Sequence, residues 1–397
     1  MSVKSRLRIG IIGLGSRGCG LAKNWHQPQG RSIVVAGMDI NKDFLAPFKK
    51  PIGPDVYVTG DIKRFLARED IEAVAVASPD FTHEEYVLQA FKAGKHVFCE
   101  KPMAITTEGC DRMLEAWHNS GKHFMVGFNM RYMNLFRVMK DIADSGVIGQ
   151  IKVVWVRHFV GHGGDWYYHD WHANSKNTTS LLLQKASHDI DMVHWITGKY
   201  SRRVCAFGSL DYYGGDQPDT LRCPQCPKKD ECVEYQYVVS GPGSNMNMCV
   251  FRKGVDVEDQ STVIMELEGG IKAVYLQCHY TPDYWRDYTF IGTEGRMENL
   301  DDESKVIVKT RDRSKRWKNL ADQVYDIKQA AGEHGGADPL ICKDFVDMVL
   351  DDKKPVATPL AGRMSVAVGC AATESIRKGL GMVVIRPVPA NLKDRDF

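Results

Sequence analysis

Residues 8–18 read RIGIIGLGSRG, an apolar run that leads into three closely spaced glycines. The apolar part predicts a strand over Arg8–Ile12, and a helix is expected to begin near Arg17. Gly13, Gly15 and Gly18 suit the intervening turn: the first permits a tight turn, the second lets backbone approach a pyrophosphate, and the third lets helix and strand pack closely. The stretch predicts dinucleotide binding, with Ser16 and Arg17 at the helix N-terminus beside the phosphates. The alternative is a flavodoxin-like unit whose glycines serve packing alone.

Asp39 ends the next predicted strand, Ser32–Met38, and lies 21 residues beyond Gly18. A carboxylate at this point can accept hydrogen bonds from a ribose 2′-OH, and it would repel a 2′-phosphate. Ile40 and Asn41 supply no arginine beside it. The sequence therefore favours NAD over NADP.

Strands and helices continue to alternate through the first third of the chain. Parallel neighbours need a crossover, so strands separated by helices indicate a parallel sheet. We expect a doubly wound Rossmann domain that binds NAD over residues 1–126. Its further strands are predicted at Ala73–Ala77, His96–Cys99 and Phe124–Gly127. Its helices are predicted at Ile62–Ala67, His83–Ala93 and Thr107–Asn119.

After about residue 127 a helix over Leu135–Ser145 leads into long, alternating, aromatic-rich strands with few helices between them. This order indicates a large, mostly antiparallel open sheet in an α+β domain over residues 127–397, which makes the whole chain α/β in class. Glu268-Gly269-Gly270 is a hairpin signal. The strands are expected at Ile151–Val160, Arg203–Leu210, Thr262–Leu267, Ile271–Tyr280, Tyr288–Gly292 and Lys305–Lys309. Helices near Leu181–Thr197, Leu340–Leu350 and Met364–Lys378 are expected to cover one face of this sheet.

The composition narrows the class of protein. The 397 residues carry a net charge of +2 and no block of like charges, which argues against a nucleic acid or a membrane surface as partner. The apolar runs are strand-length, far below the ~20 residues that a spanning helix needs. The N-terminus shows no secretion signal, so the 11 cysteines are expected as thiols or metal ligands in a cytoplasmic enzyme.

Several short motifs occur once each, in a specific order, along nearly the whole chain. They are the glycine turn, Ser78-Pro79-Asp80-Phe81-Thr82-His83, Cys99-Glu100-Lys101-Pro102, Asn129-Met130-Arg131-Tyr132, His188-Asp189-Ile190-Asp191, Gly292-Thr293-Glu294-Gly295 and His334-Gly335-Gly336. In this order the sequence resembles the Gfo/Idh/MocA family, named for glucose-fructose oxidoreductase, inositol dehydrogenase and a rhizopine-catabolism protein. The resemblance implies a Rossmann domain, then an α/β domain whose open sheet often pairs subunits, hence a homodimer or homotetramer. It also implies an NAD(H)-dependent oxidoreductase acting on a ring hydroxyl of a sugar, sugar acid or cyclic polyol.

The motifs also supply site residues. Ser78, His83, Glu100 and Asn129 are expected at the cofactor together with Lys101. Lys101 follows a parallel strand at its carboxyl end, where ligands bind in such sheets, and can stabilise the alkoxide that precedes hydride loss. His188 is the candidate general base, because its ordinary pKa of about 6.5 suits proton removal near neutral pH.

The predicted helix of His188 carries other polar side chains. Asp191 shares the helix face of His188 and is expected to orient its imidazole or to bind substrate. Arg131 is also expected to bind substrate. Asp189 points away from that face and is expected as a cap or interface residue. Many dehydrogenases of the family carry an acidic residue four positions before this histidine; here Gln184 stands there, followed by Lys185. Lys185 and Lys101 facing each other would favour an acidic sugar or keep the histidine neutral.

Residues 158–172 read HFVGHGGDWYYHDWH. Aromatic faces stack on sugar rings while histidine and aspartate bind hydroxyls, so Trp166, His169 and Trp171 are candidate substrate contacts. An oligomer interface would explain the same composition. His334 is a further candidate, because the adjacent glycines let its loop approach closely.

Cys223, Cys226 and Cys232 form a C-x2-C-x5-C pattern. A structural zinc ion needs four ligands, so Cys249 or Cys205 would complete the set. A redox pair, a disulfide and free thiols are the alternatives.

The site residues leave three classes of function open. The first is a dehydrogenase. The second is a glycosidase that uses NAD transiently to oxidise a ring hydroxyl, eliminate the glycosidic substituent and reduce the ring again. The third is a non-catalytic NAD or sugar sensor, against which Lys101 and His188 together argue.

Overall fold

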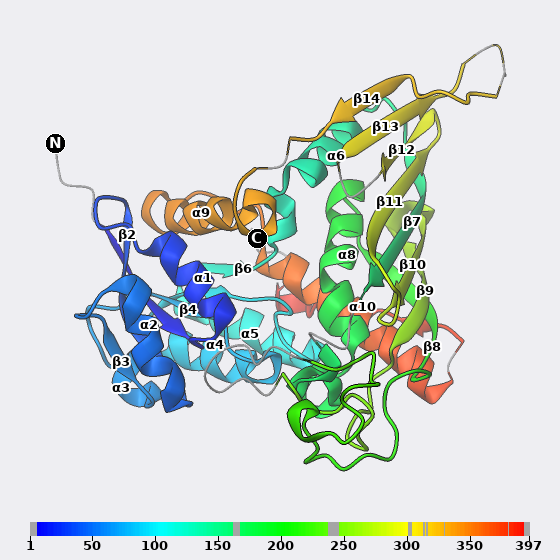
Figure 1. The fold of residues 1–397 in the computed structure, drawn as a ribbon. Coiled ribbons are helices and arrows are strands. Elements are labelled where there is room, and N and C mark those ends of the chain that lie inside the picture. Colours follow the sequence, from blue (N-terminus) through cyan, green and yellow to red (C-terminus); the bar gives the residue numbers. More distant parts are fainter. Residues whose placement is uncertain are drawn as a thin grey trace.

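The computed structural model of the chain describes residues 6–161, 167–236, 246–300, 304–312, 314, 317–328, 330–379 and 381–392. Two sheets dominate these residues. The first is built from the N-terminal third, and the second lies at the other side of the molecule with helices between them (Figure 1).

The first sheet has six parallel strands in the order β3-β2-β1-β4-β5-β6. Its strands are β1 Leu7–Ile12, β2 Ser32–Met38, β3 Tyr57–Thr59, β4 Ala73–Val76, β5 His96–Cys99 and β6 Phe124–Val126. Its helices are α1 Ser16–Trp25, α2 Leu45–Ile52, α3 Ile62–Leu66, α4 His83–Lys92 and α5 Thr107–Ser120. The order reverses between β1 and β4, which makes their carboxyl ends the place where a dinucleotide binds in such sheets. The predicted Rossmann fold is confirmed.

The second sheet has nine strands in the order β14-β13-β12-β11-β7-β10-β9-β8-β15. Its strands are β7 Ile151–Val160, β8 Ser201–Ser209, β9 Gln260–Leu267, β10 Lys272–Cys278, β11 Tyr284–Gly292, β12 Gly295–Leu300, β13 Lys305–Thr310, β14 Gln323–Asp326 and β15 Val383–Val384. Only the β10–β7 pair is parallel among these described strands. The mostly antiparallel sheet is confirmed, as is the turn Glu268–Gly270 between β9 and β10.

Helices α6 Asn134–Asp144, α8 Leu181–Thr197 and α10 Pro359–Lys378 pack on one face of this sheet. The short helix α7 Ser175–Thr178 precedes α8. Ser180 caps α8 through the Leu183 amide, and Gly198 ends it in the left-handed region with φ of 64°. Helix α8 therefore has fixed ends, as its sequence predicts.

Helix α9, Ala337–Asp351, is not where the sequence analysis put it. Rather than covering the second sheet, it packs beside α1 on the first (Figure 1). The Trp25 indole donates to the Cys342 carbonyl at 3.0 Å, and Phe345 contacts both Trp25 and Phe98. The apolar stripe of α9 thus completes the core of the first domain.

The other face of the second sheet is open. Along β7, Val154 and Val156 are fully buried, whereas Val153 and Trp155 are 41% and 57% exposed. The alternation of a strand therefore leaves large apolar side chains outside the core. Among the described residues, no helix is long and apolar enough to cross a membrane.

Candidate active site

The glycine turn has the shape that a bound dinucleotide requires. A Cβ on Gly13, whose φ is +88°, would lie 2.6 Å from the Ser78 nitrogen, and a Cβ on Gly18 would lie 1.9 Å from the Gly13 carbonyl oxygen. Gly15 has no atom within 4 Å of its would-be Cβ. Gly13 and Gly18 are thus fixed by the fold, and Gly15 leaves open space in front of the α1 N-terminus, which begins at Ser16. This cradle fits a pyrophosphate.

Asp39 is held at the carboxyl end of β2 by two backbone amides. The Leu14 amide donates to Oδ2 and the Asn41 amide to Oδ1, each at 2.8 Å. Each carboxylate oxygen keeps capacity for a further hydrogen bond. The site therefore fits the ribose hydroxyls of NAD beside the glycine turn.

Arg17, by contrast, is engaged by the protein. It donates to Glu100 and to Asp338 at 2.6 Å each, which leaves only Nη2 without a partner. Asn129 and His334 also bind Asp338, at 3.0 and 2.9 Å. Burial raises the pKa of Asp338, but the bonds from His334 and Arg17 outweigh it and hold that pKa below its usual range. The five side chains tie α1, α9 and the loop after β5 together, so Arg17, Asn129 and His334 have structural contacts, and the ligand contacts expected of them stay predictions.

His83 also acts on the protein rather than presenting its ring to a cofactor. Its two ring nitrogens lie 2.8 Å from the Pro102 carbonyl oxygen and 2.9 Å from the Ser78 carbonyl oxygen. The side chain is 1% exposed. His83 therefore clamps the loop after β4, with Ser78, to the loop after β5, with Lys101.

Lys101 meets helix α8 of the second domain. Its Nζ donates to the Gln184 carbonyl oxygen at 3.3 Å, and the next residue, Lys185, donates from Nζ to the Tyr167 hydroxyl at 2.9 Å. His188 follows one turn later on the same helix, half-buried, with its Nδ1 buried and without a hydrogen-bond partner. The geometry brings the predicted catalytic pair, Lys101 and His188, to one junction of the two domains.

Burial and the neighbouring cations at this junction both lower the pKa of His188. Burial lowers the pKa of His188 well below 6.5, and the cations Lys101, Arg286 and Lys185 lower it further. Burial also lowers the pKa of Lys101, and Lys185 adds to that effect. A neutral imidazole can accept a proton, and an ammonium group beside it can stabilise an alkoxide.

Asp80 is a site residue that the sequence analysis did not single out. It is 5% exposed, its Oδ2 has no hydrogen-bond partner, and burial raises its pKa against the opposing effects of His83, His172 and Lys101. The motif Ser78–His83 contained it, and an acidic residue after a parallel strand was the available signal.

Tyr167 and Trp171 line the same junction from the aromatic segment. The Tyr167 ring lies 5.3 Å from that of His172, and Trp171 stacks on His172 at 3.6 Å. Trp171 also contacts Phe81 of the first domain edge to face at 6.0 Å. Tyr167 was missed among several neighbouring aromatics. Trp166, predicted beside it, lies outside the described residues.

The substrate contacts predicted for Arg131 and Asp191 are replaced by a buried ion pair. Arg131 Nε and Nη2 donate to the two Asp191 oxygens at 2.8 and 2.6 Å, and Nη1 donates to the Val356 carbonyl at 2.6 Å. The side chains are 7% and 0% exposed. The Asp191 carboxylate is fully buried against Arg131 and is not exposed to a substrate, so it orients Arg131 rather than His188.

Asp189 was expected as a cap or interface residue, and that expectation is wrong. It is fully buried and accepts hydrogen bonds from Arg286 at 2.8 Å, Tyr275 at 3.1 Å and Tyr288, with His158 Nδ1 at 3.0 Å. Burial raises its pKa, but Arg286 and His158 outweigh this and hold it well below the usual range. These bonds fix α8 to strands β7, β10 and β11, and hence fix the helix face that carries His188.

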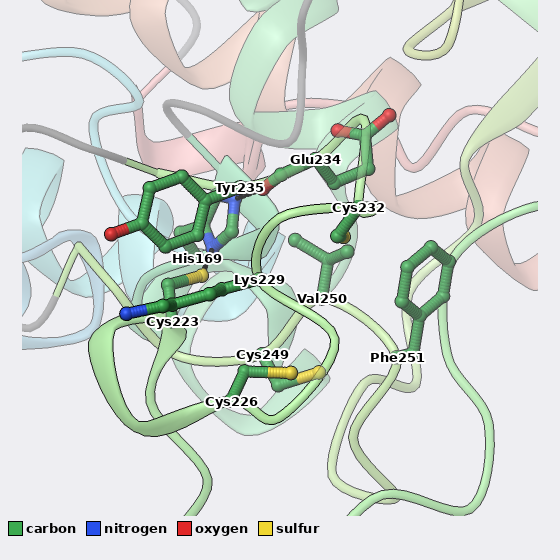
Figure 2. A pocket seen from close by; sticks show the side chains of 10 residues that line it. All are labelled: His169, Cys223, Cys226, Lys229, Cys232, Glu234, Tyr235, Cys249, Val250 and Phe251. Atoms are coloured by element: carbon green, nitrogen blue, oxygen red, sulfur yellow. Dashed lines mark hydrogen bonds between the residues drawn. The ribbon is translucent and has the colours of Figure 1, made fainter.

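His169 is likewise not at the junction. Its ring nitrogens lie 2.6 Å from the Met248 carbonyl oxygen and 2.8 Å from that of Glu234, and its Nδ1 lies 3.6 Å from Cys223 Sγ. It lines a separate cavity with Cys223, Cys226, Cys232 and Cys249 (Figure 2). Within the described residues no three His, Cys, Asp or Glu side chains are already arranged as a metal-holding group.

The fold and this site define a class: a two-domain, NAD-dependent oxidoreductase. A family model described as an oxidoreductase family with an NAD-binding Rossmann fold matches residues 7–128, and the model of its C-terminal alpha/beta domain matches residues 140–384. The chain belongs to this family, Gfo/Idh/MocA, and the resemblance drawn from the motifs is confirmed.

Individual relatives agree with this placement. The chain is 27% identical to YteT of Bacillus subtilis over 80% of this chain and 82% of that protein. It is 35% identical to inositol 2-dehydrogenase of Pseudomonas savastanoi pv. phaseolicola, over 48% of this chain and only 54% of that enzyme. Levoglucosan dehydrogenase in complex with NADH and levoglucosan shares the fold with a TM-score of 0.76, at 19% identity over 96% of this chain and 100% of that one.

Proposed function

We propose that the chain transfers a hydride between NAD and the ring carbon that bears a hydroxyl in a sugar, sugar acid or cyclic polyol. In this proposal residues 1–126 hold NAD and residues 127–397 hold the substrate. The observation that carries it is the meeting of Lys101, from the first domain, with the Lys185–His188 turn of α8. NAD would supply the hydride acceptor, held by the Gly13–Gly18 turn and Asp39.

The protein's own groups would handle the proton. The neutral His188 imidazole accepts the proton of the reacting hydroxyl, and the Lys101 ammonium stabilises the oxygen as it becomes an alkoxide. The Asp189 network holds His188 in place, because the two residues are adjacent on a helix anchored to three strands. In the reverse direction the same two groups return the proton.

Two half-buried cations, Lys101 and Lys185, favour a substrate with a negative charge. Neither Lys101 nor Lys185 forms an ion pair among the described residues. Burial lowers the pKa of both, against the opposing effects of the more distant carboxylates of Asp80 on Lys101 and Asp189 on Lys185. A sugar carboxylate between the two ammonium groups would satisfy both charges. The relatives named as inositol and levoglucosan dehydrogenases instead support an uncharged sugar or cyclic polyol as substrate. A panel of uronates, aldoses and inositols therefore orders these classes directly.

Replacement of His188 tests the proposal. His188→Gln should lower turnover by roughly two to four orders of magnitude, the usual contribution of a general base. NAD binding should be unchanged. His194→Gln is the matched control, since His194 is a buried histidine of the same helix bound to Ser201 at 2.9 Å. Near-normal turnover in His188→Gln would assign the proton to another group, such as Tyr167.

A second candidate is the NAD-recycling glycosidase. The Tyr167–Lys185 contact of 2.9 Å favours it, because elimination needs a second group that moves a proton. The two functions differ in their balance of NADH. Net NADH absorbance during turnover with added NAD indicates the dehydrogenase, whereas release of the glycosidic substituent without net NADH indicates the glycosidase.

The open face of the second sheet supports a homo-oligomer. Large apolar side chains are exposed across neighbouring strands, as a subunit interface requires. They are Val153, Trp155, Phe207, Ile264 and Ile291.

We place the enzyme in the cytoplasm, where 11 reduced cysteines are expected. Hydride transfer needs no metal ion, so a zinc ion among the cysteines would have a structural part.

A further inference from the structure

Four of the cysteines line a single cavity outside the junction of Lys101 and His188. Cys223, Cys226, Cys232 and Cys249 surround it together with His169 (Figure 2). Cys205, the other candidate fourth ligand, lies on β8 and does not line it. The structure thus selects Cys249, which lies 17 residues from the nearest member of the sequence pattern.

Backbone hydrogen bonds hold three of the four positions, Cys223, Cys226 and Cys249, together. The Cys226 amide donates to the Cys223 carbonyl at 3.1 Å, which closes the C-x2-C turn. The Cys223 amide donates to Asn247 at 2.8 Å, and the Cys249 amide donates to Leu221 at 3.0 Å. Two distant segments are therefore paired directly at the cysteines, so the proximity of the thiols is built into the backbone.

The surrounding segment has little regular secondary structure. Between β8 and β9 the described residues form one 3₁₀ turn, Cys223–Gln225, and no longer helix or strand. Its apolar cluster is small and shared with the aromatic segment and α8: Tyr168, Ala173, Leu181, Tyr213, Val250, Val255 and Val257. Connections of this length without secondary structure are uncommon in compact domains, and small cores of this kind are commonly completed by a metal ion.

We propose that these four cysteines bind one structural Zn²⁺ as thiolates. Four sulfur ligands in a C-x2-C pattern with distant partners match the tetrahedral requirement of zinc. The side chains are not yet arranged around one point, so binding would turn the thiols inward while the backbone positions stay. The free energy of coordination would then stabilise a segment whose described residues have one 3₁₀ turn and a small apolar cluster.

The zinc site would also hold in place the aromatic segment that lines the proposed active site. The Met248 amide donates to the His169 carbonyl oxygen at 3.1 Å, and Met248 directly precedes the proposed ligand Cys249. Arg252 donates to the carbonyls of Tyr168 and Asp170. The zinc-bound segment would thereby hold the 167–172 chain that presents Tyr167 and Trp171 to the active site.

Metal content tests the proposal independently of activity. Protein purified without added metal, chelator or a metal-affinity column should contain about one zinc per chain by mass spectrometry, since one tetrahedral site takes one ion. Cys226→Ser should lose it, whereas the matched control Cys205→Ser should keep it. If Cys226→Ser does not fold, reconstitution of chelated wild-type protein with Co²⁺ should give thiolate-to-cobalt charge-transfer absorption.

Three results would overturn the assignment: folded wild-type protein without stoichiometric metal, a disulfide among these cysteines in the intact mass, or iron with inorganic sulfide in place of zinc. None of them bears on hydride transfer. Conversely, full zinc content in a protein that turns over no sugar would reject the proposed function alone.

Discussion

Replacing Asp191, the buried ion-pair partner of Arg131, tests whether this pair has a structural or a substrate-binding role. In Asp191→Asn the amide keeps the shape of the carboxylate but removes its charge. The Arg131 guanidinium, 7% exposed, then keeps the Val356 carbonyl as its remaining acceptor outside the pair. Breaking a buried pair by removing one partner costs about 3–5 kcal/mol, because the other charge stays buried and uncompensated.

For a domain of this size that loss corresponds to a fall in melting temperature of roughly 6–20 °C. Thermal unfolding followed by circular dichroism measures it. The matched control is Glu266→Gln, which removes one charge of a solvent-accessible pair with Arg203 and should leave the melting temperature nearly unchanged. Kinetics well below the melting temperature should show an unchanged KM for substrate. An unchanged melting temperature with a strongly raised KM would refute this reasoning and restore the substrate-binding role.

Three further predictions concern the cofactor, the base and the open sheet. Asp39→Ser should weaken NAD and improve NADP relative to it, because the carboxylate that repels a 2′-phosphate is gone; a cofactor titration with unchanged preference would reject the assignment. Since burial and neighbouring cations lower the pKa of His188, the acid limb of kcat/KM should lie well below pH 6.5. Lys185→Gln removes one of those cations and should move this limb to higher pH, and a limb that stays in place would exclude His188 as its origin. Trp155→Glu should dissociate the oligomer in light scattering at unchanged melting temperature, whereas an unchanged mass would move the interface elsewhere.

Local patterns in the sequence were enough for the fold and for part of the site. The glycine spacing, the position of Asp39 and the alternation of strands and helices follow from nearest neighbours along the chain. The bounds of α8 were predicted to the residue, because Ser180 and Gly198 mark its ends chemically. Strands β3, β12, β14 and β15 were not predicted. β14 and β15 are short and mostly exposed edge elements whose pairing depends on their neighbours.

The partners of charged side chains were decided only by the tertiary structure. His334 and Asn129 both bind Asp338, which is more than 200 positions from Asn129 in the chain. The sequence shows that such groups are polar, but a buried charge takes whichever partner the fold brings within about 3 Å. The motifs therefore predicted that His334 and Asn129 lie near the active site. They did not distinguish a contact with a ligand from a contact with a buried carboxylate.

The same distinction applies to Asp189 and to the cysteines. Helical spacing put Asp189 off the face of His188, which was sound geometry, yet the second sheet covers that side of α8 and makes the residue its anchor. The sequence likewise supplied three cysteines in a metal-binding pattern, and only the pairing of residues near 222 and 248 selected Cys249 as the fourth. Spacing along a chain fixes which side chains share a turn or a face, whereas contacts between distant segments depend on how the whole core packs.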